Sequence, residues 1–132
     1  MDRLGRLLIV EDEPRDLKRA ADNAILAGFS EVEGKTTPQA ALQYLEDQMA
    51  AGRELPDGIL LDLDFGQDSG YELIRQWHSN PRLHAIPLIV WSILGEDHKT
   101  VCNLFKIKHF IGKWEGNEAL QEALKSIVEP VK

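Results

Sequence analysis

Short apolar runs alternate along this chain with segments in which apolar residues recur at helical spacing. Uninterrupted apolar runs lie at residues 7–10, 58–61 and 88–91, and each of them ends at a polar side chain. Runs of this length are typical of strands that are buried on both faces of a parallel sheet. The pattern therefore predicts three central strands with helices covering both faces of the sheet.

Two weaker segments complete the predicted sheet. Residues 31–36 are polar and include Gly34, so they are compatible only with a strand near a sheet edge. The segment "HFIGK", residues 109–113, has the apolar character of a last strand. The sequence thus predicts five strands in all.

Helical spacing separates these strands. Pro14 suits a first helical turn and Gly28 a C-terminal cap, while Thr37 before Pro38 is typical of an N-cap. The expected helices cover residues 14–28, 37–52, a segment around residues 73–77 that ends before Pro81, a weakly patterned segment at residues 101–105, and residues 117–128. Five strands that alternate with five helices, without an internal repeat, predict a three-layer α/β sandwich around a parallel sheet.

The composition changes this picture little but excludes several functions. The chain has 132 residues, of which 43% are hydrophobic and 28% charged, so we expect one domain, residues 1–132, with its own core. Twenty-two acidic residues against 15 basic ones give a net charge of −7, which argues against direct binding to nucleic acid.

The location of the protein can also be predicted. No apolar tract approaches the ~18 residues that a membrane-spanning helix needs, and the first apolar run leads directly into acidic residues instead of a signal-peptide core. Cys102 is the single cysteine, which fits a reducing compartment and a role in packing. We therefore expect a cytoplasmic protein with no membrane association.

Polar residues at the ends of the predicted strands are the candidates for chemistry. Ligands of parallel α/β sheets bind beyond the carboxyl ends of the strands, where Glu11, Asp12, Asp62, Ser92 and Lys113 are expected. Three carboxylates in one crevice repel one another, and a hard divalent cation such as Mg²⁺ relieves that repulsion. An aspartate oxygen could then attack a phosphoryl donor, and the hydroxyl and ammonium groups could bind the transferred group.

Five motifs in order resemble those of the receiver domains of two-component response regulators, over essentially the whole chain. They are the acidic pair in "IVEDEP", the strand "DGILLDLD", the loop and helix "GQDSGYELI", the strand "LIVWS" and the strand "HFIGK". The resemblance is to single-domain regulators of the chemotaxis type. It implies a flavodoxin-like fold with strand order 2-1-3-4-5, the order that also holds for a chemotaxis regulator.

The resemblance also assigns roles to residues. It implies that Asp62 is phosphorylated, that Asp12 binds Mg²⁺ directly and Glu11 through a water molecule, and that Asp64 adds a backbone carbonyl ligand. Ser92 and Lys113 would bind the phosphoryl group, and Phe110 would be an aromatic switch that turns inward upon phosphorylation. Expected partners are a sensor histidine kinase or phosphotransfer protein, and a downstream protein on the face of the fourth helix, fifth strand and fifth helix.

The sequence departs from the family pattern at four positions. Ile93 replaces a small residue and could crowd the path to Asp62. Trp114 replaces a proline whose cis peptide helps to orient the preceding lysine; a cis bond before another residue costs about 3 kcal/mol, so a trans bond is expected. Phe110 lacks the hydroxyl of the commoner tyrosine, and Asp64 adds a fourth carboxylate.

Two other functions are compatible with parts of the sequence. A pseudo-receiver would keep the fold as an interaction module without phosphorylation, as Ile93 and Trp114 would suggest. The motif "DLDFG" also resembles the D-x-D motif of haloacid dehalogenase-like phosphatases, with Asp62 as nucleophile and Asp64 as general acid. In those enzymes the motif lies near the start of the domain, whereas here the acidic pair precedes it. Glu11 and Asp12, taken alone, could also merely cap a helix.

Overall fold

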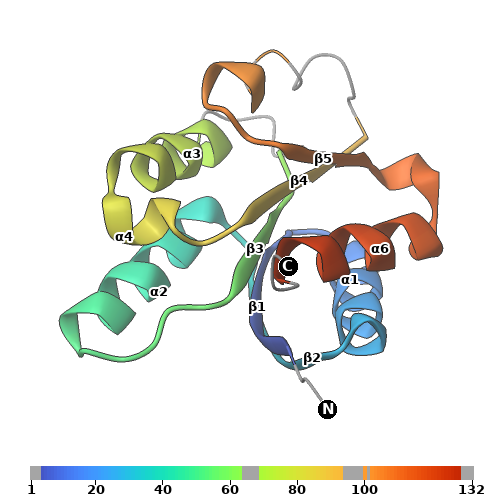
Figure 1. Ribbon diagram of the computed structural model, residues 1–132, viewed down its shortest axis with the longest axis horizontal. Coiled ribbons are helices and arrows are strands. Elements are labelled where there is room, and N and C mark those ends of the chain that lie inside the picture. The colour runs from blue at the N-terminus through green and yellow to red at the C-terminus, as the bar shows by residue number, and fades with distance from the viewer. Residues whose placement is uncertain (1–3, 64–68, 94–99, 101, 129–132) are drawn as a thin grey trace.

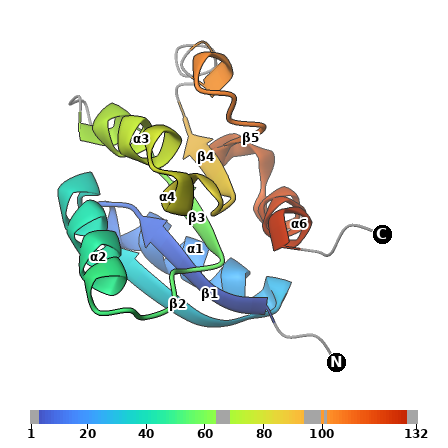
Figure 2. The same ribbon diagram turned by 60° about the vertical axis from the view of Figure 1, so that its left-hand side comes forward.

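The computed structural model describes residues 4–63, 69–93, 100 and 102–128. They form a parallel five-stranded sheet between two layers of helices (Figures 1 and 2). The strand order is β2-β1-β3-β4-β5, which confirms the predicted flavodoxin-like class. The strands are β1 (Leu4–Val10), β2 (Phe29–Lys35), β3 (Gly58–Leu61), β4 (Leu88–Ser92) and β5 (His109–Gly112).

The helices cover the two faces of the sheet unequally. Helices α1 and α6 lie on one face, and α2, α3 and α4 lie on the other (Figure 1). Their bounds are α1 (Pro14–Ala27), α2 (Pro38–Ala50), α3 (Ser69–Ser79), α4 (Pro81–His84) and α6 (Asn117–Val128), with a 3-10 turn, η1 (Lys113–Glu115), after β5. In the weakly patterned segment, residue 100 and residues 102–104 are helical, and Val101 lies outside the described residues.

The prediction of five helices was wrong in one respect. Pro81 ends α3, as expected, but it also begins the short helix α4. The Asn80 side chain accepts a hydrogen bond from the Arg82 amide at 2.9 Å and so acts as the N-cap. Proline lacks an amide hydrogen and is therefore tolerated in a first helical turn, where that hydrogen has no partner within the helix.

The predicted helix ends and the predicted edge strand are confirmed. Gly28 caps α1 in the left-handed conformation, with φ of 114°. The Thr37 hydroxyl accepts a hydrogen bond from the Ala40 amide at 3.0 Å and caps α2. The polar strand β2 lies at one edge of the sheet, although it begins at Phe29, two residues before the predicted start.

Alternate strand residues point into two separate apolar layers. On one face Leu8, Val10, Ile59 and Leu61 pack against α2, α3 and α4. On the other face the neighbouring residues of the same strands pack against α1 and α6; they are Leu7, Ile9 and Leu60, joined by Ile89, Trp91 and Ile111. The carboxyl ends of the strands are therefore held rigidly between two packed layers.

Cys102 belongs to the first of these layers. It is 2% exposed, and burial raises the pKa of its thiol to about 11. The thiol is therefore protonated and unreactive at neutral pH, which agrees with the predicted packing role. Within the described part of the chain, no helix has the length and apolar character needed to cross a bilayer.

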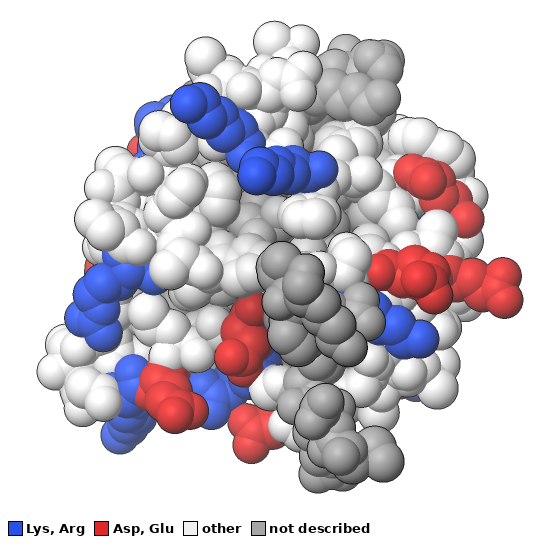
Figure 3. All heavy atoms as spheres, in the orientation of Figure 1, with Lys and Arg blue, Asp and Glu red and all other residues white. Residues whose placement is uncertain are grey.

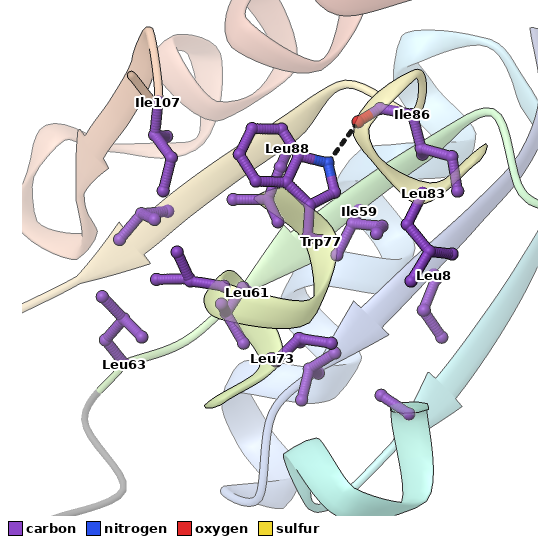
Figure 4. Packing of buried hydrophobic residues seen from close by; sticks show 14 of the residues in the cluster. Leu8, Ile59, Leu61, Leu63, Leu73, Trp77, Leu83, Ile86, Leu88 and Ile107 are labelled. Atoms are coloured by element: carbon purple, nitrogen blue, oxygen red, sulfur yellow. Dashed lines mark hydrogen bonds between the residues drawn. The ribbon is translucent and has the colours of Figure 1, made fainter. Parts of the chain in front are cut away.

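Trp77 of α3 ties the helical layer to the segment that enters β4. Trp77 is 5% exposed, and its indole nitrogen donates a hydrogen bond to the Ile86 carbonyl at 2.8 Å (Figure 4). Among the described residues this bond provides the partner of the Ile86 carbonyl, which would otherwise be buried and unsatisfied in the turn between α4 and β4. Such an unsatisfied buried group costs about 1–3 kcal/mol.

Trp77→Phe should lower the free energy of unfolding by about 1–3 kcal/mol for the lost bond, and the small void that it leaves should add to this loss. Urea unfolding followed by far-UV circular dichroism measures the change. Trp114→Phe is the matched control, because Trp114 is 65% exposed. The free energy of unfolding of this variant should lie within about 0.5 kcal/mol of the parent value. Equal losses of unfolding free energy in both variants would contradict the stabilising role of this hydrogen bond.

Candidate functional site

The register of the sheet brings the predicted site residues to one edge. Val10 pairs with Leu61, so the residues that follow them, Glu11 and Asp62, leave neighbouring strands together. Ser92, the last residue of β4, pairs with Gly112 of β5, and Lys113 is the residue after Gly112. Because all strands are parallel, these side chains meet at the carboxyl end of the sheet.

Lys113 lies at the centre of this group. Its ammonium is 2.8 Å from a Glu11 oxygen, 3.0 Å from an Asp16 oxygen and 3.5 Å from an Asp62 oxygen. The side chains of Lys113, Glu11 and Asp62 are only 8%, 1% and 2% exposed. Burial acts to lower the pKa of Lys113, but the hydrogen bonds to Glu11 and Asp16 and the charge of Asp62 outweigh it, so the pKa is raised and the ammonium stays charged.

Backbone hydrogen bonds fix the two buried carboxylates. The Glu11 amide donates to the Lys35 carbonyl at 2.9 Å, and the Asp62 amide donates to the Val10 carbonyl at 3.0 Å. The second oxygen of Glu11 accepts a hydrogen bond from the Glu13 amide at 3.0 Å. The N-cap of α1 is Glu13, so capping of the helix does not explain Glu11 and Asp12.

Glu11, Asp12 and Asp62 form a group that could bind a metal ion. One carboxylate oxygen from each lies within 4.8 Å of the others, and Asp12 is exposed where the other two are buried. The Lys113 ammonium contacts three carboxylates, those of Glu11, Asp16 and Asp62, and Asp12 lies beside two of them, so a further cation would relieve the repulsion that remains. A donor set made only of oxygen atoms suits Mg²⁺ or another hard divalent cation, and exposure at Asp12 leaves room for water ligands. The predicted fourth ligand, Asp64, lies outside the described residues.

The two predicted switch residues occupy different environments. Ser92 is fully buried at the end of β4, beside Gly112 of the neighbouring strand. Phe110 is half-buried in β5 and packs against the apolar layer formed with α2, α3 and α4. Ile93, directly after β4, is 61% exposed, and the expectation that it could crowd the path to Asp62 stays a prediction.

The segment after Lys113 differs from a proline-bearing loop. The Lys113–Trp114 peptide is trans, as predicted, and residues 113–115 form the turn η1. The Glu115 side chain accepts a hydrogen bond from the Gly112 amide at 2.7 Å and closes this turn. The indole of Trp114 covers Gly112 so closely that a side-chain carbon at residue 112 would lie 2.4 Å from the ring.

Three residues of the site were missed by sequence reasoning. Asp16 and Arg19 lie three positions apart on α1, which places them on one face of the helix, toward Lys113. The buried ring of Trp91 is 5.2 Å from the Arg19 guanidinium carbon and 4.9 Å from the Lys113 ammonium. The three-residue spacing was the available signal, but nothing in it identified the partner.

Comparison with known proteins relates the chain to regulatory proteins. No family model matches it. A curated protein of Methanothrix harundinacea (strain 6Ac), "Probable methanogenesis regulatory protein FilR2", is 34% identical over 94 residues, which make up 69% of this chain and 59% of that protein. The chain thus spans less than two thirds of that relative.

Two solved structures extend the comparison to the whole fold. The phosphorylated cyanobacterial phytochrome response regulator RcpA is 28% identical, with a TM-score of 0.75 over 94% of this chain and 91% of that one. The Mn²⁺-bound form of response regulator Rcp1 has a TM-score of 0.76 over 96% of each chain, at 22% identity. The first resembles the chain in sequence and fold, and the second in fold.

Titration with Mg²⁺ should give a saturable change in tryptophan fluorescence, because Trp114 follows Lys113 in the chain and the Lys113 ammonium, which contacts Glu11 and Asp62, lies 4.9 Å from the centre of the Trp91 ring. Asp12→Ala should abolish the change by removing the exposed carboxylate ligand. Asp22→Ala, which removes an exposed acid on α1 outside the acidic group, should titrate like the parent. A normal titration in Asp12→Ala would contradict the assignment of the ligands.

Proposed function

Since the chain belongs to the receiver domains of response regulators, we propose that it is a switch whose phosphoryl group is carried by Asp62. One observation above all supports this: Asp62 is a buried carboxylate at a strand end, 3.5 Å from a buried ammonium and within the acidic group that includes Glu11 and Asp12. A buried acid in such surroundings is a candidate for chemistry and not only for stability.

The proposed reaction is a phosphoryl transfer to Asp62. A carboxylate oxygen forms a bond to phosphorus while the bond from phosphorus to the donor breaks, and the donor leaves with the electron pair. Bound Mg²⁺ would neutralise the phosphoryl oxygens; we propose Asp12 as its direct ligand, Glu11 as a ligand through water, and Asp62 and the Asp64 carbonyl as the others. Lys113, already charged beside Asp62, would bind a phosphoryl oxygen.

Ser92 and Phe110 would convert phosphorylation into a change of shape. Ser92 ends β4, the strand beside β3, and we propose that its hydroxyl bonds the phosphoryl group. Phe110 is only half-buried on the neighbouring strand β5, which allows it to pack more deeply if Ser92 moves. The phosphoryl group shifts the equilibrium only through contacts that one state makes and the other lacks, and the Ser92 hydroxyl is the proposed contact.

We propose two kinds of protein partner. A sensor histidine kinase or phosphotransfer protein would supply the phosphoryl group, and a downstream protein would bind the face of residues 102–104, β5 and α6. That face includes an edge strand of the sheet and Leu104, which is 73% exposed. A large apolar side chain and an open strand edge are features that partner proteins use.

The proposed role is regulatory, without nucleic-acid binding or turnover of a separate substrate. In the orientation of Figure 1, Figure 3 shows basic side chains set among acidic and neutral ones, without a continuous basic stripe over the described residues in view. The net charge of −7 points the same way. We place the protein in the cytoplasm, away from membranes, where Cys102 would stay reduced.

Incubation with acetyl phosphate and Mg²⁺ should add one phosphoryl group to the parent protein, and Asp62→Asn should remain unmodified because the nucleophile is gone. Intact-mass spectrometry measures the product. Asp57→Asn, at the other end of the same strand, is the control and should load normally. Loading of Asp62→Asn would overturn the assignment, absence of loading in the parent would favour the pseudo-receiver, and steady release of phosphate would favour the phosphatase.

The same assay tests the role of Asp64 in the lifetime of the phosphoryl group. We expect Asp64→Asn to load and then to lose the phosphoryl group more slowly, because a carboxylate two residues after the nucleophile could orient or deprotonate the attacking water. If Asp64 instead repels the phosphoryl group, the variant would load faster and decay at the parent rate. Unchanged loading and decay would return Asp64 to the role of a solvated loop acid.

Hydrogen exchange tests the switch directly. Addition of beryllium fluoride, a phosphoryl mimic, with Mg²⁺ should alter exchange in peptides that contain Ser92, residues 100–108 and Phe110, and Ser92→Ala should suppress the change. Peptides from β2, at the far edge of the sheet, serve as the internal reference. Identical exchange with and without the mimic would mean that Ser92 and Phe110 do not act as a switch.

A further inference from the structure

The orientation of Lys113 needs an explanation in this chain, because Trp114 stands where the family carries proline. With a trans peptide after Lys113, the main chain turns directly into η1 and then into α6. The ammonium nevertheless reaches Glu11, Asp16 and the neighbourhood of Asp62 from this turn. Something other than a cis-proline must therefore hold the main chain at Lys113.

Arg19 of α1 makes the contacts that such a role requires. One terminal nitrogen of its guanidinium donates a hydrogen bond to the Lys113 carbonyl at 3.2 Å, and its Nε donates to the Asn117 side-chain oxygen at 2.7 Å. Lys113 is the first residue of η1 and Asn117 the first of α6. A single planar guanidinium thus binds both ends of the segment that carries the lysine.

The position of Arg19 is itself held by contacts with Trp91 and Asn23. Its guanidinium carbon lies 5.2 Å from the ring of Trp91, which is 1% exposed, and the Lys113 ammonium lies 4.9 Å from the same ring. Asn23, one turn further along α1, donates to the Arg19 carbonyl at 2.8 Å and accepts a hydrogen bond from Gln121 of α6 at 2.7 Å. The cation–π contact restrains the guanidinium, and the two bonds of Asn23 join this turn of α1 to α6.

Arg19 binds neutral acceptors. Both are neutral oxygens, and within the described residues Arg19 makes no ion pair with a carboxylate, although Asp16 lies three positions before it. Asp16 binds the Lys113 ammonium instead. Helix α1 therefore holds Lys113 at two points, its carbonyl through Arg19 and its ammonium through Asp16.

We infer that Arg19 is a positioning residue for Lys113: it fixes the main chain after β5, so that the ammonium stays beside Glu11 and Asp62 without a cis-proline. The inference rests on the proposed function insofar as Lys113 binds the phosphoryl group. It concerns the resting structure as well, because the ammonium is ordered by these contacts before any phosphoryl group arrives.

Arg19→Lys is the decisive variant. It keeps the charge and the contact with Trp91 but cannot bind two separate acceptors with a rigid fork. We expect acetyl phosphate loading to slow by about tenfold or more, since small displacements of a positioned group have effects of that size. The affinity for Mg²⁺, which depends on Glu11, Asp12 and Asp62, should stay within about twofold of the parent.

A second readout does not depend on phosphorylation. In the parent protein the buried Lys113 ammonium should give an NMR signal that is protected from hydrogen exchange, and Arg19→Lys should reduce the protection. Arg15→Lys is the matched control, because Arg15 lies one turn earlier on α1, is exposed, and makes no side-chain ion pair with the described residues. It should leave loading, Mg²⁺ affinity and ammonium exchange unchanged.

The two measurements separate the possible outcomes. If Arg19→Lys lowers ammonium protection while the parent fails to load, the positioning role stands and the proposed phosphorylation fails. If Arg19→Lys loads at the parent rate with an unchanged ammonium signal, the inference is overturned. An equal loss of loading and Mg²⁺ affinity would also overturn it, because it would indicate general disruption of the site and not displacement of the lysine.

Discussion

One buried ammonium, that of Lys113, allows the carboxyl end of this sheet to exist in its observed form. Glu11 and Asp62 leave neighbouring strands almost without exposure to solvent, where two like charges would repel strongly. The lysine contacts both from the turn η1 after β5, and it also contacts Asp16 of α1. Removal of one partner from such a buried pair typically costs about 3–5 kcal/mol, so the charges that serve chemistry also constrain the fold.

The fold could be predicted largely because its signals are local or periodic. Strands buried on both faces appear as unbroken apolar runs, which identified β1, β3 and β4, and the caps at Gly28 and Thr37 depend only on adjacent residues. The errors arose where one residue has two consequences. Pro81 was interpreted as the end of a helix, whereas the N-cap at Asn80 makes it also the beginning of α4.

The site was predictable only in part, for a related physical reason. Glu11, Asp62, Ser92 and Lys113 follow from the rule that ligands bind beyond strand ends, since that rule requires only the order of the strands. The contact of Lys113 with Asp16 joins residues 97 positions apart, and its contact with Arg19 joins residues 94 positions apart. Such contacts depend on how α1 packs against the β5–α6 segment, and a periodic pattern in the sequence carries no information about that packing.

The two apolar layers have a consequence for how substitutions combine in this protein. Leu60 and Leu61 are adjacent in the chain, yet they belong to layers on opposite faces of the sheet. Substitutions in different layers share few neighbours, so their effects on stability should be close to additive. The exception lies at the carboxyl edge, where Lys113 contacts α1 on one face and the strand ends at the centre. Epistasis, in evolution or in engineering, is therefore expected to concentrate around this residue and to be weak across the rest of the sheet.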